Sequence, residues 1–358
     1  MKGIKLTAIL FAVTITFSGC SLGHKTKQTD SSSFENLTIT PHMEEQIKGD
    51  KNILYCSTFQ LAWNELKDNI IKGDIRLSGS EPGMVKYLNK ELSTKKDLSD
   101  KDYVAMAGFG KDEIVKKIND ELKSKFKDQA PTVAEQLKQD DIFAYAFLYK
   151  NLKFQNKFEK LKQTISFSGS TGVKGVKGFG IIKYKDSTSA RKVAEQVTIL
   201  DYKNDNDFII KLKSNSPKDE IILAKLKPEQ TLLETIKAVE ERSKTSSQSN
   251  IAENDTLQIP CFDFNIDHNY TELLDKPLMN SGFEDYEIVK AKQNVLFKLN
   301  ETGATLKSEV KITMTKSAPM VTHRLVFDKP FLLMLKEKDA AYPYFAIWVQ
   351  NAELLVNN

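Results

Sequence analysis

The chain has 358 residues, of which 40% are hydrophobic and 28% charged, and its 52 Lys and Arg against 48 Asp and Glu leave a net charge of +4. This composition is typical of a folded chain of one or two domains and argues against a disordered or multi-span membrane protein. The near balance of charge argues against nucleic acid as a partner. With four His and three Cys, we expect no metal cage and no cofactor. Cys56 and Cys261 could pair or stay free, because sequence spacing does not fix proximity.

The first twenty residues are predicted to be an export signal. A basic start, MKGIK, leads into an apolar stretch over residues 4–17, and Ser18-Gly19-Cys20 follows as a small-residue cleavage site. The apolar stretch is too short, and too often interrupted by Thr, to favour a membrane-spanning helix. Its ending resembles the lipobox of bacterial lipoproteins, with Phe17 in place of the usual Leu.

That resemblance implies that residues 1–19 are removed as a lipoprotein signal peptide and that Cys20 carries the lipid. The mature protein is then expected at the cell membrane, lipid-anchored and facing the outside of the cytoplasm. An ordinary secretory signal with a chance Cys is the alternative. Residues 20–35 are polar and small, which predicts a flexible tether. Residues 36–358 are predicted to form a single domain.

The body of the chain shows helical patterns first and strand patterns later. Apolar residues at helical spacing predict helices over residues 52–71, 111–126 and 228–242. A continuous apolar run predicts a buried strand over 141–154. Further strand patterns cover residues 193–200, 207–212 and 220–226 and recur from residue 257 onward. This order predicts an α+β fold with a large central sheet, N-terminal helices and a β-rich C-terminal half.

Motifs of the common catalytic sites are missing from the sequence. It has no paired-His zinc motif, no CxxC pair, no G-x-S-x-G elbow and no Walker loop. The glycine-rich run 169–180 lacks the strand and helix of a phosphate cradle, so it predicts a turn or hairpin. His42, His268 and His323 have no partner motif for a serine nucleophile. We therefore expect that the protein is not an enzyme.

Five motifs in the last hundred residues occur in the order and spacing of the C-terminal half of serpins. They read LQIPCFDF from Leu257, YTELL from Tyr270, VLFKLNETG from Val295, FDKPFLLML from Phe327 and YFAIWVQN from Tyr344. They resemble the family's IPKF strand, the helix after it, the N-E-x-G entry to the reactive loop, the D-x-PF-x-F strand and the closing strand. A fainter similarity upstream extends the resemblance over most of the chain. It implies a serpin-like fold and a serine protease as partner.

The segment after Gly303 contains the candidate reactive loop. From Ala304 to Thr315, small or apolar residues alternate with polar ones, which is the pattern of a half-buried strand. The resemblance implies that this segment inserts into the central sheet after a protease cleaves beyond it, and that the stored strain traps the protease covalently. The hinge residues that it assigns are Glu301, Gly303, Ala304, Thr305, Leu306, Ser308 and Val310. Lys316-Ser317, 13 residues after Gly303, is the candidate scissile bond and suits a trypsin-like protease with an acidic pocket.

Several positions depart from the family pattern. Carried over position by position, a polar cluster that lies beneath the sheet is replaced at Cys56-Ser57, Phe59, Tyr145, Phe154 and Gln293. Apolar and aromatic groups at these positions are expected to impair the opening of the sheet. In the hinge, Leu306, Lys307 and Glu309 replace the usual small residues. The alternative is therefore a non-inhibitory binding or structural lipoprotein with a serpin fold, whose residues 304–315 form a permanent strand.

Overall fold

The computed structural model describes residues 7–16, 26–182, 188–303 and 322–357. The helices are α1 (Thr58–Glu65), which continues as a π-helical turn η2 (Leu66–Ile71), α2 (Gly83–Leu88), α3 (Ile114–Phe126), α4 (Thr188–Ala194) and α5 (Leu232–Thr245). Short 3₁₀ turns are η1 (Ser31–Ser33), η3 (Lys95–Asp97), η4 (Asp100–Asp102), η5 (Gly110–Asp112), η6 (Lys127–Gln129), η7 (Thr271–Leu273) and η8 (Ala352–Leu354). Within these described ranges, no helix is both long and apolar enough to cross a membrane.

Strands make up most of the described structure. They are β1 (Thr7–Thr16), β2 (Thr29–Asp30), β3 (Leu37–Thr40), β4 (Asn52–Cys56), β5 (Tyr103–Phe109), β6 (Ile142–Tyr149), β7 (Glu159–Lys160), β8 (Ile165–Gly169), β9 (Gly172–Val176), β10 (Gly178–Ile181), β11 (Val197–Asn204), β12 (Asp207–Lys213), β13 (Asp219–Lys225), β14 (Ser249–Asn250), β15 (Thr256–Pro260), β16 (Phe262–Asn269), β17 (Tyr286–Leu299), β18 (Arg324–Val326), β19 (Phe331–Glu337) and β20 (Phe345–Val349).

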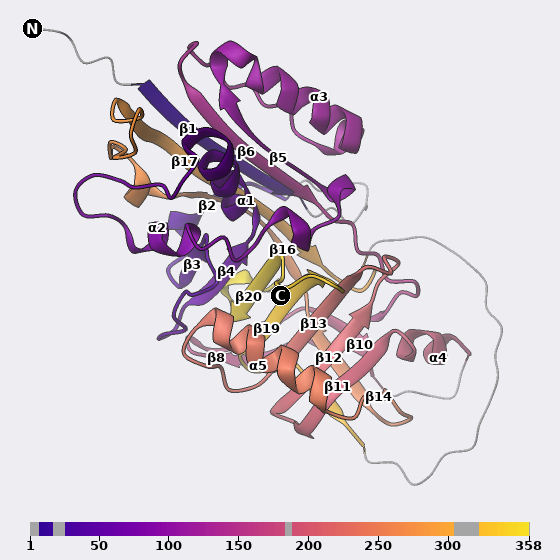
Figure 1. Ribbon diagram of the computed structural model, residues 1–358. Helices are drawn as coiled ribbons and strands as arrows, with labels where there is room; N and C mark the ends of the chain where they lie inside the picture. Colours follow the sequence, from indigo (N-terminus) through magenta and orange to yellow (C-terminus); the bar gives the residue numbers. More distant parts are fainter. Residues whose placement is uncertain (1–6, 17–25, 183–187, 304–321, 358) are drawn as a thin grey trace, which may run out of the picture.

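The strands form four sheets (Figure 1). A six-stranded sheet has the order β2-β16-β17-β1-β6-β5, an eight-stranded sheet the order β14-β11-β12-β13-β19-β20-β4-β3, and a four-stranded sheet the order β18-β15-β10-β7. Strands β8 and β9 form the hairpin that the glycine-rich run predicts. Helices α1 and α3 pack against β5 and β6, whereas α5 packs on the eight-stranded sheet. The predicted α+β class is confirmed.

Strand β6 is buried on both faces, as its continuous apolar sequence predicts. Ala144, Ala146 and Leu148 belong to the main core together with α1, whereas Phe143 and Phe147 lie under α3. Helix α3 contributes the apolar face that its spacing predicts, namely Ile114, Ile118, Leu122 and Phe126. The two helices therefore cover opposite faces of the six-stranded sheet at β6.

The helix predicted over residues 52–71 is divided into a strand and a helix. Residues 52–56 form β4, a fully buried strand between β20 and β3, and the helix begins only at Thr58. The sequence of β4, NILYC, contains a β-branched and an aromatic residue, which favour a strand. A strand buried on both faces has no alternation of apolar and polar residues, so its sequence can match a helical spacing by chance.

The apolar N-terminal stretch lies inside the six-stranded sheet. Residues 7–16, which are predicted to belong to the signal peptide, form β1 between β6 and β17 and pair in parallel with both. Val13, for example, lies opposite Ala146 on one side and Gln293 on the other. The sequence TAILFAVTIT combines apolar with β-branched residues, a composition that suits a buried strand. Removal of this segment during export stays a prediction.

The described part of the predicted tether packs on the domain. Strand β2 forms the edge of the six-stranded sheet and pairs in parallel with β16. The Thr26 hydroxyl donates to Asp263 Oδ1 at 2.5 Å, and Ser31 Oγ lies 2.8 Å from His268 Nδ1. Residues 26–35 of the predicted tether therefore lie on the domain, where Thr26 and Ser31 find partners, and the bounds of the tether stay a prediction.

Candidate functional site

The position between β6 and β17, which we call the strand slot, is the first element of the site. Strand β1 occupies it, pairing along ten residues with β17 and along eight with β6. Since β1 is parallel to both neighbours, β6 and β17 are parallel to each other. Without β1, their facing backbone groups would have to pair with each other or with another strand. The strand slot thus has the length of a complete strand and lies at the centre of the sheet.

A buried polar network lies beneath the strand slot. Gln293 of β17 is fully buried, and its Nε2 donates to the Cys56 carbonyl at 3.2 Å and to Thr58 Oγ1 at 3.1 Å. Its Oε1 accepts a hydrogen bond from the Tyr270 hydroxyl at 2.6 Å. The ring of Phe59 packs on that of Tyr270 with 4.3 Å between the centroids. Both ends of the amide are satisfied, so breaking this network has a free-energy cost.

The expectation that apolar and aromatic groups replace the polar cluster is corrected by this network. Phe59 does lie in it, but Gln293 also bonds to Tyr270 and Thr58, which are not among the positions expected for the polar cluster. Burial raises the pKa of Tyr270 well above its ordinary value, so the hydroxyl stays protonated and donates. Tyr145 packs in the cluster under α3 instead. A polar layer is therefore present, built from different residues.

Strand β17 ends in a tight turn over residues 300–303. The Gly303 amide donates to the Asn300 carbonyl at 3.1 Å, and the Thr302 hydroxyl donates to Asn300 Oδ1 at 2.6 Å. Gly303 has a φ of +48°, and a Cβ atom there would lie 2.2 Å from the backbone nitrogen of Phe154. Both the left-handed backbone and the close approach require glycine. Phe154 is thus part of this hinge rather than of the polar network.

Glu301 holds the hinge turn to the segment that follows β6. Its buried carboxylate lies 3.5 Å from Lys157 Nζ and 3.3 Å from Lys160 Nζ. Its carbonyl accepts the Phe158 amide at 2.9 Å. The two lysines are largely exposed, so each ion pair contributes little alone, but a buried carboxylate without them would be costly. The turn is therefore clamped on both its backbone and its side chain.

The structure brings together two of the predicted site residues, Glu301 and Gly303, in this turn. The other predicted residues lie outside the described ranges: Ala304, Thr305, Leu306, Ser308, Val310, Lys316, Ser317 and Cys20. The described chain resumes at residue 322, where His323 Nδ1 lies 3.0 Å from Asp255 Oδ2.

An ionic cluster joins the end of β6 to the eight-stranded sheet. Lys150 Nζ, which is buried, lies 2.8 Å from Asp102 Oδ2, 2.9 Å from Asp219 Oδ1 and 2.6 Å from Glu337 Oε1. Burial by itself raises the pKa of Glu337, but hydrogen bonds from Lys150 and from the Ser99 amide outweigh it, so this pKa lies below its ordinary value. This cluster holds the C-terminal end of β6, which lies at the same end of the sheet as the turn that follows β17.

No other group in the described structure has the form of a reactive centre. None of its His, Cys, Asp and Glu side chains gather in a group that could hold a metal ion. Cys56 and Cys261 are free thiols, and burial raises the pKa of each to about 12, which keeps them protonated. Burial, with Lys90 nearby, lowers the pKa of His42 to about 4. The strand slot and its hinge therefore remain the candidate site.

Comparison with known proteins gives likenesses of structure. No family model and no curated protein matches this sequence. The chain is similar to thyroxine-binding globulin in complex with thyroxine, with a TM-score of 0.49 and 11% identity over 84% of this chain and 93% of that one. A structure of human thyroxine-binding globulin complexed with thyroxine gives a TM-score of 0.45 and 12% identity over 84% of this chain and 92% of that one. Serpin48, a serpin of the insect Tenebrio molitor, gives a TM-score of 0.46 and 11% identity over 85% of this chain and 92% of that one. At this identity the likeness concerns the fold alone.

Proposed function

We propose that this chain is an exported, lipid-anchored, serpin-like inhibitor that traps a trypsin-like serine protease. The observation that carries the proposal is the strand slot, a central sheet position bordered by two parallel strands and adjoining the hinge turn. In the full chain a segment from far away in the sequence lies there. Because that segment is also the predicted signal peptide, its removal would leave the position for another strand.

Residues 304–315 have the sequence to take this place. They follow directly on the hinge turn, so a strand returning from it would run antiparallel to both β17 and β6. Antiparallel pairing is slightly more stable per residue than the parallel pairing of β1. On β17, Val295 and Phe297 face the core, whereas Lys292 and Lys298 are more exposed. The alternation of apolar and polar residues from 304 onward matches such a one-sided environment.

The chemistry would be that of a one-use substrate. The protease serine attacks the Lys316 carbonyl carbon, the bond to the Ser317 nitrogen breaks, and that nitrogen takes the proton from the protease histidine. The acyl ester then remains on Lys316. Insertion of residues 304–315 would carry the attached protease away before water hydrolyses the ester, as in the serpins that this chain resembles. The inhibitor itself needs no catalytic residue.

A non-inhibitory binding or structural lipoprotein is the second candidate. Two observations favour it. The strand slot is filled in the full chain. The hinge turn is held in place, because Glu301 pairs with lysines and Gly303 lies directly against Phe154. Leu306, Lys307 and Glu309 add bulk and charge that would slow insertion. Slow insertion would let a protease complete hydrolysis and leave.

The test is to mix the processed protein with trypsin at near-equal molar ratio and to run a denaturing gel. We expect an adduct that survives denaturation, disappears in Lys316→Ala and Leu306→Arg, and persists in Thr305→Arg, which places the same side chain on the polar face. The full chain, with β1 in the strand slot, is expected to be cleaved without an adduct. Cleavage of the processed protein without an adduct or a gain in thermal stability would favour the second candidate.

A further inference from the structure

Lysines are concentrated in the stretch of chain that contacts the hinge. Between residues 152 and 182 there are six Lys and a single carboxylate, that of Glu159, whereas the whole chain has a net charge of only +4. We call these six residues the lysine rim: Lys153, Lys157, Lys160, Lys162, Lys174 and Lys177. All except Lys153 are exposed. The local excess of charge therefore exceeds what the composition of the protein suggests.

The fold brings members of the lysine rim together at the hinge end of the molecule. Lys157 and Lys160 both lie against the buried carboxylate of Glu301. Strand β7 ends at Lys160 and pairs with β10, which begins directly after Lys177. Three of the six lysines are thus held beside the turn that ends β17.

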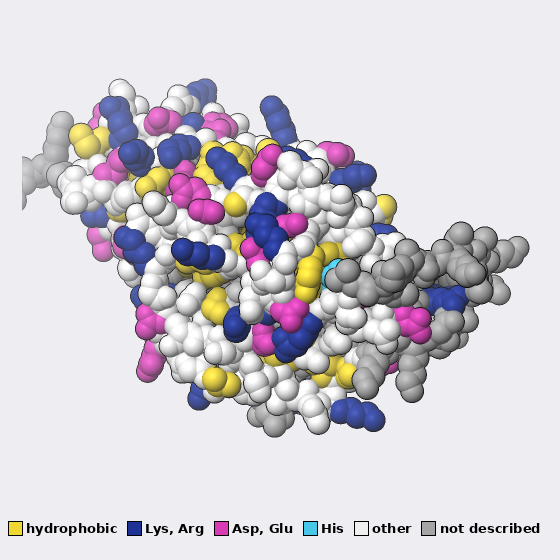
Figure 2. Space-filling model, turned by 90° about the horizontal axis from the view of Figure 1, so that it is seen from below, with side chains coloured by type: hydrophobic (Ala, Val, Ile, Leu, Met, Phe, Trp, Pro, Cys, Tyr) yellow, Lys and Arg dark blue, Asp and Glu magenta, His cyan; other side chains and the backbone are white. Residues whose placement is uncertain are grey.

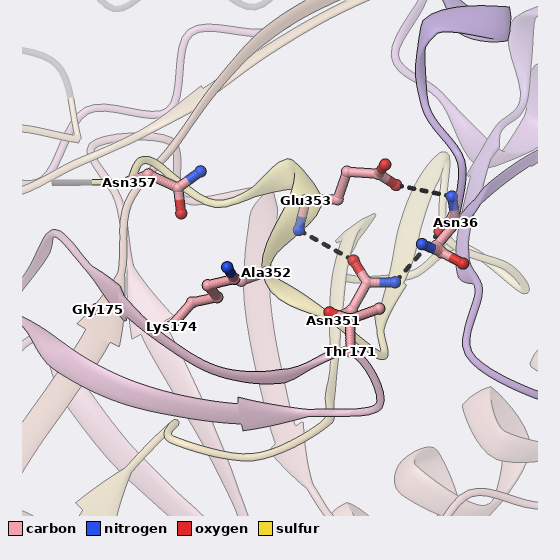
Figure 3. A pocket seen from close by; sticks show the side chains of 8 residues that line it. All are labelled: Asn36, Thr171, Lys174, Gly175, Asn351, Ala352, Glu353 and Asn357. Carbon is pink, nitrogen blue, oxygen red and sulfur yellow. Dashed lines mark hydrogen bonds between the residues drawn. The ribbon is translucent and has the colours of Figure 1, made fainter.

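Lys174 belongs to the same end of the molecule. It lines a cavity of about 470 Å³ together with Asn36 and Asn357, between the hairpin β8–β9 and the C-terminal residues (Figure 3). Glu353 lines the cavity too, but its two oxygens accept the backbone amides of Glu35 and Asn36 at 2.9 and 3.1 Å. The Glu353 carboxylate is therefore held by backbone amides and forms no ion pair with Lys174 in the described structure.

Of the carboxylates near the lysine rim, those of Glu301 and Asp263 form ion pairs, whereas that of Glu159 forms none in the described structure. In the view of Figure 2, Lys and Arg side chains project from the surface with Asp and Glu among them. The net charge of any one region of the surface therefore depends on how many of its lysines have a carboxylate partner. Asp263 is paired with Lys298 at 2.7 Å. Lys162, Lys174 and Lys177 form no ion pair among the residues that the structure describes. The lysine rim thus keeps a positive excess.

The described segment that begins at residue 26 starts at this same end. Strand β2 runs parallel to β16, so the chain before it leads back toward the start of β16. There Thr26 donates to Asp263, and the Cys261 amide, two residues before Asp263, donates to the Lys177 carbonyl at 2.9 Å. Cys20 is six residues from Thr26, a distance of at most about 22 Å for an extended chain. A lipid on Cys20 would therefore hold a bilayer close to the lysine rim.

We propose that the lysine rim docks on the anionic phospholipid surface of the membrane that holds Cys20. The lipid anchor belongs to the proposed function, whereas the charge excess and the position of Thr26 come from the described residues. Anionic headgroups attract Lys only within about one Debye length, roughly 8–10 Å, so the short connection is what makes the contact available. Basic residues beside an acyl chain are a common second signal for membrane attachment.

The test measures co-sedimentation of the full chain carrying Cys20→Ser with vesicles of phosphatidylcholine alone or mixed with phosphatidylglycerol. The rim variant is Lys162→Gln/Lys174→Gln/Lys177→Gln, whose lysines have no ion pair to lose in the described structure. The matched control is Lys111→Gln/Lys117→Gln/Lys138→Gln, three exposed lysines without an ion pair in the described structure, which lie near the opposite end of β5 and β6. All three proteins keep residues 1–19, so any contribution of that apolar segment cancels.

We expect the binding constant for anionic vesicles to fall about tenfold or more in the rim variant, to change little in the control, and to fall with added salt. Equal losses in the two variants, binding that ignores lipid charge, or no binding to anionic vesicles would each overturn the proposal. Unfolding midpoints of the three proteins check that they are equally folded. Because no protease and no acyl group takes part, this result is independent of the adduct test and of lipidation at Cys20.

Discussion

The two large sheets differ in what lies at their centres. In the eight-stranded sheet, β13, β19 and β20 pair antiparallel in succession, and residues such as Leu333 and Trp348 are fully buried. In the six-stranded sheet, the central β1 is parallel to both neighbours, and the polar network of Gln293 lies beneath it. Apolar contacts are lost outright on separation, whereas polar groups can exchange partners. The eight-stranded sheet is therefore suited to be a fixed support, and the six-stranded sheet is suited to exchange its central strand for another.

The largest effect is expected from the fixed sheet. Trp348→Ala removes a fully buried ring and should lower the free energy of unfolding by about 3–5 kcal/mol, measured by urea denaturation. Val289→Ala, at a half-exposed position on β17, is the control, with an expected change within about 0.5 kcal/mol. Similar costs for both would show that the eight-stranded sheet is not the more tightly packed part.

The hinge turn should be the next most sensitive position. Gly303→Ala adds backbone strain of about 1–2 kcal/mol and an overpacking cost of about 1–3 kcal/mol against Phe154. Gly282→Ala is the matched control, because Gly282 also has a positive φ but no atom near its added Cβ. The difference in unfolding free energy between the two variants isolates the clamp. If the two variants are equally stable, Phe154 moves to accommodate the added methyl group, and its contact with Gly303 does not hold the hinge turn in place.

The polar network beneath the strand slot is best tested by a double-mutant cycle. Gln293→Leu leaves the buried Tyr270 hydroxyl without its acceptor, and we expect a loss of about 1–3 kcal/mol in unfolding free energy. Tyr270→Phe should have a smaller cost, because it removes only one of the hydrogen bonds of Gln293. The double variant should cost less than the sum of the two, since no hydroxyl is then left unpaired. Strict additivity would mean that the two side chains act independently.

The smallest effect concerns pH. The lowered pKa of Glu337 means that its contribution to stability is present above its ordinary pKa of 4.5 and is lost as the pH falls through the lower folded value. We expect the unfolding free energy of the wild type to fall more steeply below pH 4.5 than that of Glu337→Gln. Chemical denaturation at a series of pH values measures this. Parallel curves for the two proteins would contradict a stabilising role of the ionic cluster.

Local sequence patterns predict those helices and strands that bury one face only or that are buried along their whole length. Helix α3 agrees with its periodicity because it buries one face, and strand β6 agrees with its continuous apolar run because both of its faces are buried. Helix α5 starts at Leu232 and not at residue 228, because Thr231 and Glu234 form a capping box there. For β1, one apolar sequence suits both a signal peptide and a buried strand, so composition alone could not exclude the strand.

The candidate site divides in the same way. Glu301 and Gly303 could be predicted because the turn is local and glycine is required at a positive φ. Tyr270 and Thr58 could not, since the network joins three elements distant in sequence. One signal was available: Gln293 occupies the inward-facing row of β17 between Ala291 and Val295. A polar residue in such a row needs a partner, which predicts that a network exists without saying who supplies it.

The rate at which the buried thiol of Cys56 is modified can report how often the central sheet opens. Its side chain is fully buried at the floor of the strand slot, where its carbonyl also accepts from Gln293. A thiol reagent in excess can modify it only when the sheet separates, so the rate of alkylation counts openings rather than measuring chemical reactivity. Cys261, which is only partly buried, provides the reference rate in the same molecule. The frequency with which the central sheet opens is therefore accessible by mass spectrometry on the unmodified protein.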